Sequence, residues 1–133
     1  MSPELEMRLI KSYPMLYKQA GLPMTQTCMC WGMECDDGWF SIIDGLSKKI
    51  EFWNECHPDQ RVEAVQVKEK YGSLRFYIDN YVDEVEKWIE EADLESEKTC
   101  EICGEPGEIR NFGWLKCLCD KHEQERKDQN ENH

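Results

Sequence analysis

Two stretches, Cys100-Glu-Ile-Cys103-Gly104 and Leu118-Cys119-Asp-Lys-His122, form the most specific pattern in this chain. Together they give Cys-x2-Cys, a spacer of 15 residues and Cys-x2-His. Three thiolates and an imidazole suit the tetrahedral coordination of zinc, and a metal with four protein ligands keeps no open position for a reacting water. The pattern therefore predicts one structural Zn2+ per chain, bound by Cys100, Cys103, Cys119 and His122.

The residues around these ligands predict a treble-clef-like module. Gly104 permits a tight turn after the first pair, and residues 111–113 (Asn-Phe-Gly) fit the turn of a β-hairpin. The second pair opens a helix, so Cys119 and His122 share one face. Cys117 is an alternative ligand to Cys119. We favour Cys119 because the Cys-x2-His spacing requires a helical turn, whereas Cys117 falls in the preceding strand.

Upstream of this module, apolar periodicity predicts an α+β core over residues 1–97. Ser2 and Pro3 fit the start of a short helix that is kinked at Pro14, and residues 24–36 form an irregular connection. A longer helix begins at Asp36 or Asp37. Its apolar residues recur at a spacing of 3.6, which predicts a buried stripe of Trp39, Ile42, Ile43, Leu46, Ile50 and Trp53.

From Val62 the apolar period changes to two, which predicts an antiparallel hairpin. Its buried residues are expected to be Val65, Val67, Leu74, Phe76 and Ile78. A third helix follows, with Asn80 as its predicted N-cap and a buried stripe of Val82, Val85, Trp88, Ile89 and Ala92. The zinc-binding module then covers residues 98–126, and the polar residues 127–133 are expected to fray. The predicted fold class is α+β with a C-terminal treble-clef-like zinc module.

Composition narrows the classes of function. The 133 residues contain no apolar run long enough to span a membrane. Residues 1–6 are acidic and lack the features of a signal peptide, so the eight cysteines are expected to be reduced and the protein cytoplasmic. The formal net charge of −12 repels nucleic-acid phosphate and disfavours generic DNA or RNA binding.

Charge is concentrated on two predicted surfaces. Residues 81–99 contain eight acidic residues against two lysines, and we predict that this acidic helix contacts a protein partner through Glu86, Glu90 and Glu91. The hairpin carries the opposite charge at Lys68, Lys70 and Arg75. A nucleic-acid-associated zinc-finger protein is therefore the alternative hypothesis, with a basic face formed by Lys68, Lys70, Arg75, Arg110 and Lys116.

Three stretches together resemble a family of small, largely uncharacterised proteins encoded by bacteriophages and prophages: residues 32–40 (Gly-Met-Glu-Cys-Asp-Asp-Gly-Trp-Phe), residues 65–77 (Val-Gln-Val-Lys-Glu-Lys-Tyr-Gly-Ser-Leu-Arg-Phe-Tyr), and the two cysteine pairs. The resemblance implies phage origin, a zinc-finger-like C-terminus and no catalytic residues. Family members pair Cys-x2-Cys-Gly with Thr-Leu-Cys-x2-His, which also favours Cys119 over Cys117.

Two further hypotheses concern residues outside the zinc pattern. Cys28, Cys30, Cys35 and Cys56 are a second candidate metal site, although their spacing lacks a paired knuckle. Asp36, Asp37 and His57 are candidates for a small metal-dependent nuclease or hydrolase site, but the predicted zinc hairpin contains no histidine to activate water. We therefore expect a binding protein with no enzymatic activity. As a phage accessory protein, it would bind a host or phage protein, modulating a host factor or inhibiting an antiviral defence system.

Overall fold

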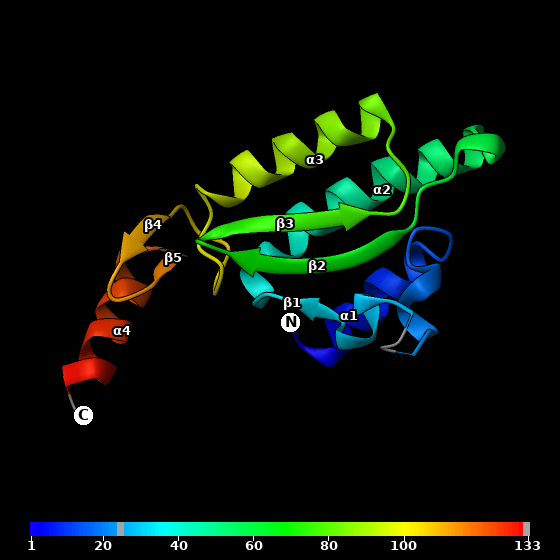
Figure 1. Ribbon diagram of the computed structural model, residues 1–133. Helices are drawn as coiled ribbons and strands as arrows, with labels where there is room; N and C mark the ends of the chain where they lie inside the picture. The colour runs from blue at the N-terminus through cyan, green and yellow to red at the C-terminus, as the bar shows by residue number, and fades with distance from the viewer. Residues whose placement is uncertain (24–25, 132–133) are drawn as a thin grey trace.

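The computed structural model describes residues 1–23 and 26–131 and confirms the α+β class (Figure 1). A sheet of three strands has the order β1 (Met33–Glu34), β2 (Ala64–Lys70) and β3 (Ser73–Ile78). The helices beside it are α1 (Pro3–Ser12), α2 (Phe40–Cys56) and α3 (Asp83–Ser96). The C-terminal module contains β4 (Glu108–Asn111), β5 (Leu115–Leu118) and α4 (Asp120–Glu131), and it lies beyond the tip of the β2–β3 hairpin.

Helix α1 starts as the sequence predicts and ends earlier. The Ser2 hydroxyl accepts a hydrogen bond from the backbone N–H of Leu5 at 3.4 Å, and Pro3 is the first helical residue. The helix stops at Ser12 and is not kinked at Pro14, so this prediction was wrong. The residue before a proline is driven out of the α region, which here ends the helix.

Helix α2 forms the centre of the core. A 3-10 turn, Asp37–Trp39, leads into it, and the predicted stripe is buried from Trp39 to Ile50, while Trp53 is partly buried. A second, polar stripe on α2 was not predicted. It comprises Ser47, Glu51 and Asn54, all buried.

The polar stripe holds two loops against α2. The Glu51 carboxylate accepts the backbone N–H groups of Met15 and Leu16 at 3.2 and 2.9 Å. Asn54 both donates to the Val62 carbonyl and accepts from the Val62 N–H, at 2.9 and 2.8 Å. Each of these side chains satisfies backbone groups that would otherwise be buried without partners. Their spacing of three or four residues beside the apolar stripe was the signal available in the sequence.

The β2–β3 hairpin is antiparallel, as predicted, but the buried residues of β2 differ. The pairing shifts between Ala64 and Gln66, so Ala64 and Val67 are buried while Val65 is only half-buried. A bulge adds one residue to a strand and reverses the alternation beyond it, which a period of two cannot anticipate. Strand β1 pairs in parallel with β2 and was also missed, because its two residues show no period.

Helix α3 has the predicted buried stripe and a different start. Val82, Val85 and Ala92 are buried, and Trp88 and Ile89 pack against the core. The Asn80 cap was wrong: its side-chain amide donates to the Arg61 carbonyl at 3.4 Å, and no side chain caps the helix at Val82.

The C-terminal helix is longer than predicted. Helix α4 continues through Glu131 and does not fray after Arg126. The Gln124 amide donates to Asp128 at 2.9 Å, one of the i,i+4 contacts that support an exposed helix. Residues 132 and 133 lie outside the described residues. No helix in residues 1–23 and 26–131 is long and apolar enough to cross a bilayer.

Gly45, in the middle of α2, leads to a prediction about stability. A Cβ built there meets no heavy atom within 4 Å, and its side of the helix is exposed. We expect Gly45→Ala to raise the free energy of unfolding by about 0.5–1 kcal/mol, because alanine loses less conformational freedom in a helix. Urea denaturation measures the change. Gly38→Ala is the matched control and should destabilise, since its Cβ would lie 2.2 Å from the Cys100 carbonyl oxygen. A lower stability for Gly45→Ala would contradict the prediction.

Candidate metal centre

Three elements bring the predicted ligands together. Cys100 and Cys103 lie on a turn that Gly104 closes with a positive φ of 82°. Cys119 directly precedes α4, and its carbonyl accepts the Glu123 N–H at 2.9 Å, so His122 lies in the first turn of that helix. The β4–β5 hairpin connects the two pairs and is antiparallel, as predicted. Its turn lies one residue later than the predicted 111–113, because Asn111 belongs to β4 and pairs with Leu115.

Arg126 fixes the orientation of α4 against the hairpin. Its guanidinium lies 5.3 Å from the ring centroid of Trp114 and 5.6 Å from that of Phe112. The same group bonds to the Glu123 carboxylate at 3.2 Å, and both charged side chains are buried. These contacts hold His122, one turn before Arg126, at a fixed distance from the cysteine turn.

The four predicted ligands form one cluster. Their ligand atoms all lie within 4.8 Å of one another. The Sγ atoms of Cys103 and Cys119 are 3.8 Å apart, and His122 Nδ1 lies 3.6 Å from Cys100 Sγ and 3.2 Å from Cys119 Sγ. Tetrahedral zinc with ordinary bond lengths requires about 3.8 Å between sulfurs and about 3.5 Å from sulfur to nitrogen. The Cys3His cluster therefore suits a single metal ion.

The surroundings of the thiols favour a bound cation. Burial raises the pKa of the Cys100 thiol, but N–H groups of Cys103, Cys119 and Ile102 outweigh this effect and lower the pKa below its ordinary value. For Cys103, burial and the neighbouring sulfurs of Cys100 and Cys119 raise the pKa. Adjacent thiols resist shared ionisation, and a metal ion relieves that repulsion.

Cys117 is not a ligand in this arrangement. It is fully buried in the hydrophobic core, and burial raises the pKa of its thiol to about 11. It pairs with Ile109 in the β4–β5 hairpin, and its sulfur is not part of the cluster of ligand atoms. The preference for Cys119 is consistent with this geometry.

The module is joined to the core by backbone contacts at the start of α2. The Gly38 N–H donates to the Glu101 carbonyl at 2.7 Å, and the Trp39 indole N–H donates to the Thr99 carbonyl at 2.9 Å. The approach is so close that any side chain at Gly38 would overlap the backbone of Cys100 and Glu101. We call this set of contacts the Gly38 seam.

An ion cluster in which only Glu101 is fully buried reinforces the Gly38 seam and was not predicted. The Glu101 carboxylate accepts the Asp36 N–H at 3.0 Å, and Lys116 lies 3.2 Å from Asp36 and 3.8 Å from Glu101. Burial raises the pKa of Glu101, and the Lys116 charge partly offsets that effect. Glu101 lies between two ligands in sequence, and nothing local reveals that its partner is 15 residues away at Lys116.

The second candidate metal site is not formed. Cys35 precedes α2 and Cys56 ends it, so the 17 residues of that helix separate them by about 25 Å. Cys35 is buried, which raises the pKa of its thiol to about 12, whereas Cys28, Cys30 and Cys56 are exposed. Among the described residues, no group of metal-ligating side chains includes any of the four. The prediction of a second metal site was wrong, because the fold does not bring these four cysteines together.

The hypothetical hydrolytic residues are also apart. Asp36 binds Lys116, and Asp37 accepts the Ser2 N–H at 2.7 Å, both at the start of α2. His57 lies beyond the other end of the helix, with its ring stacked on Trp53 at 3.7 Å between centroids. These three side chains do not face one another across a common site.

Most of the predicted basic residues are neutralised by acidic neighbours. Lys68 and Arg75 face each other across β2 and β3, but Arg75 pairs with Asp93 of α3 at 3.2 Å. Arg110 pairs with Glu108 and Asp120. Three of the five predicted basic residues are therefore in ion pairs, namely Arg75, Arg110 and Lys116. Lys68 and Lys70 lie over the rings of Tyr77 and Tyr71.

Comparison of the chain with protein-family models, with curated protein sequences and with solved structures finds no match. The resemblance to phage-encoded proteins stays a prediction, and function is inferred from the molecule itself.

The cluster geometry predicts one metal ion per chain. We expect protein purified without chelator to contain close to one equivalent of metal by mass spectrometry, because only one cluster is assembled in the described residues. Cys119→Ser should abolish retention, whereas Cys117→Ser should preserve it. A stoichiometry near two would contradict this account and restore the exposed cysteines as ligands.

Removal of the metal should unfold the module and leave the core. Clustered thiolates repel one another when no ion is bound, so we expect chelation or Cys103→Ser to remove hydrogen-exchange protection from residue 99 onward. Helices α1 to α3 and the sheet should keep their protection because their buried apolar residues pack mainly against one another. Trp39 fluorescence should shift as its Thr99 partner is lost. Cooperative unfolding of the whole chain on chelation would contradict this two-part description.

Proposed function

We propose that the protein is a zinc-binding accessory protein that acts by binding another protein through α3, with no chemistry of its own. The observation that carries this proposal is the state of the carboxylates in residues 81–99. Of the eight acidic residues, only Asp93 forms an ion pair within the described chain. Unpaired, exposed charge of one sign raises the rate of association with a partner of opposite sign.

Zinc is the proposed metal, and its role is structural. The donor set of three sulfurs and one nitrogen favours zinc over magnesium or calcium, which take oxygen ligands. His122 Nε2 lies 3.8 Å from the Glu125 carboxylate, a partner that orients the imidazole. With four protein ligands the ion has no free position, so its effect is to keep the module folded against the Gly38 seam.

The biological setting follows from the resemblance. In a phage-encoded protein, an acidic helix would compete with nucleic acid for the basic groove of a host protein, such as a component of an antiviral defence system. The nucleic-acid-binding alternative has weaker support, because Arg75, Arg110 and Lys116 are neutralised by ion pairs. The hydrolase alternative has none in the arrangement of Asp36, Asp37 and His57.

Charge reversal on α3 tests the proposal. The partner is first identified by affinity capture from host lysate and then purified. We expect Glu86→Lys, Glu90→Lys and Glu91→Lys together to slow association by about 10-fold or more at low salt, with little change in stability, because the substituted charges steer the encounter. Stopped-flow kinetics across a salt series measures the rate.

Lys68→Glu with Arg75→Glu is the control for the alternative. This pair should leave association unchanged, and wild-type protein should show no salt-dependent affinity for single- or double-stranded DNA and RNA. If the triple variant associates at the wild-type rate at every salt concentration, recognition through the acidic surface is wrong. If the basic pair is the damaging change, the nucleic-acid hypothesis replaces it.

A further inference from the structure

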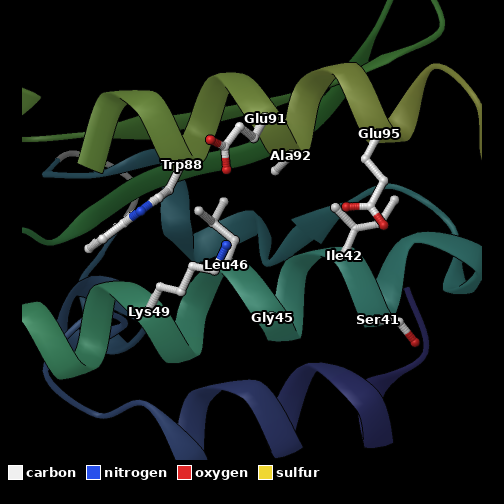
Figure 2. Close-up of a pocket in the computed structure, with 9 residues that line it drawn as sticks. All are labelled: Ser41, Ile42, Gly45, Leu46, Lys49, Trp88, Glu91, Ala92 and Glu95. Carbon is white, nitrogen blue, oxygen red and sulfur yellow. The ribbon is translucent and has the colours of Figure 1, made fainter. Parts of the chain in front are cut away.

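A groove runs between α2 and α3, with a volume of about 250 Å³ (Figure 2). Its α2 side consists of Ser41, Gly45 and Lys49, which recur every fourth residue and so follow one line along the helix. Figure 2 shows Trp88 and Glu95 extending from α3 toward α2, with the Glu91 carboxylate beside the α3 ribbon. The floor between the two helices is apolar and consists of Ile42, Leu46 and Ala92.

Gly45 keeps the middle of this groove open. Its position in a helix interior weakens α2 relative to alanine, and a Cβ there would contact nothing within 4 Å. Packing inside the chain therefore does not require glycine at this position. The absent side chain instead lets an external group approach the α2 backbone, between small residues at Ser41 and Ala92.

The rim of the groove is negatively charged. Glu91 and Glu95 stand one turn apart, and neither carboxylate has an ion-pair partner in the part of the chain that the structure describes. Lys49 is the one cation among the lining residues. Trp88 forms one wall and offers an aromatic face, on which a Lys or Arg side chain can stack. An apolar floor with carboxylates along one edge complements an occupant that is apolar on one face and basic beside it.

We propose that this groove binds an amphipathic α-helix of the partner protein, with small or apolar residues against Gly45 and Lys or Arg residues against Glu91 and Glu95. The inference rests on the proposed function and names the partner's recognition element. A helix fits because Ser41 to Lys49 spans about 12 Å, or two helical turns, and an inter-helical groove accepts a third helix lengthwise. A second copy of this chain is a poor occupant, since both copies carry a charge of −12.

A designed peptide supplies the probe. We would use a fluorescein-labelled helical peptide of about 18 residues, with Ala and Leu on one face and Lys on both flanks. Two control peptides replace the lysines by glutamate or place proline at the centre. We expect saturable binding of the basic helix below about 1 mM by anisotropy, and none of either control. In spectra of 15N-labelled protein, the shifted amides should lie in residues 41–49 and 88–95.

Two pairs of variants separate contact from long-range steering. Glu91→Gln with Glu95→Gln and Glu86→Gln with Glu90→Gln remove the same charge from the same helix, but only the first pair lines the groove. We expect the first pair to weaken peptide binding by about 10-fold, chiefly through faster dissociation, and the second pair by less than about 3-fold, through slower association. Gly45→Leu should abolish binding by filling the groove. Gly45→Ala should weaken binding while raising the unfolding midpoint.

Other outcomes would contradict the proposal that the groove binds a helix of the partner. With the natural partner, the two glutamine pairs could slow association equally and leave dissociation unchanged. That result would support recognition through the acidic surface and show that the groove is not the binding site. Binding of the proline peptide as tightly as the helix would assign the surface to an extended segment. Shifts confined to the β2–β3 face, or self-association that Gly45→Leu removes, would assign another site or a second copy. No binding at about 1 mM would also refute it.

Discussion

The approach of Gly38 to the backbone of Cys100 and Glu101 is the contact on which the arrangement of the molecule depends. Because no side chain fits there, two backbones meet directly, and the N–H of one satisfies the carbonyl of the other. The contact places the candidate metal ligands over the start of α2. Since α2 also carries the apolar stripe of the core and the polar stripe that holds residues 15–16 and 62, this one helix links all parts of the fold.

The predictions that succeeded rest on residues repeated along one element or paired at a fixed spacing. The ligand spacing, the stripe of α2 and the stripe of α3 are each set by a repeat along one element, and a repeat is visible in sequence. Several predictions failed where a contact with a second element decided the local structure. Asn80 bonds to the Arg61 carbonyl and does not cap α3. The register shift after Ala64 changes which residues of β2 are buried. Strand β1 is defined by its pairing with β2.

The same distinction explains the unpredicted polar residues. Glu51 and Glu101 appear as charged residues suited to the surface, yet both are buried because loops or strands from elsewhere bring them backbone N–H groups. A buried carboxylate is tolerated only where such donors compensate for lost hydration. Those donors belong to residues distant in the chain, so burial of these acids is a property of the tertiary structure.

The metal centre and the groove are connected through the end of α3. The helix stops at Ser96, whose hydroxyl accepts the Leu74 N–H at 2.8 Å, and three residues later the Thr99 carbonyl is bound by Trp39 at the start of α2. Both walls of the groove are therefore fixed at the end where the module lies against Gly38. If the ion keeps that module folded, it also fixes the separation of α2 and α3 beside Ser41 and Glu95. A structural metal in this protein then contributes to recognition from outside the groove, by holding two helices at the distance that a third requires.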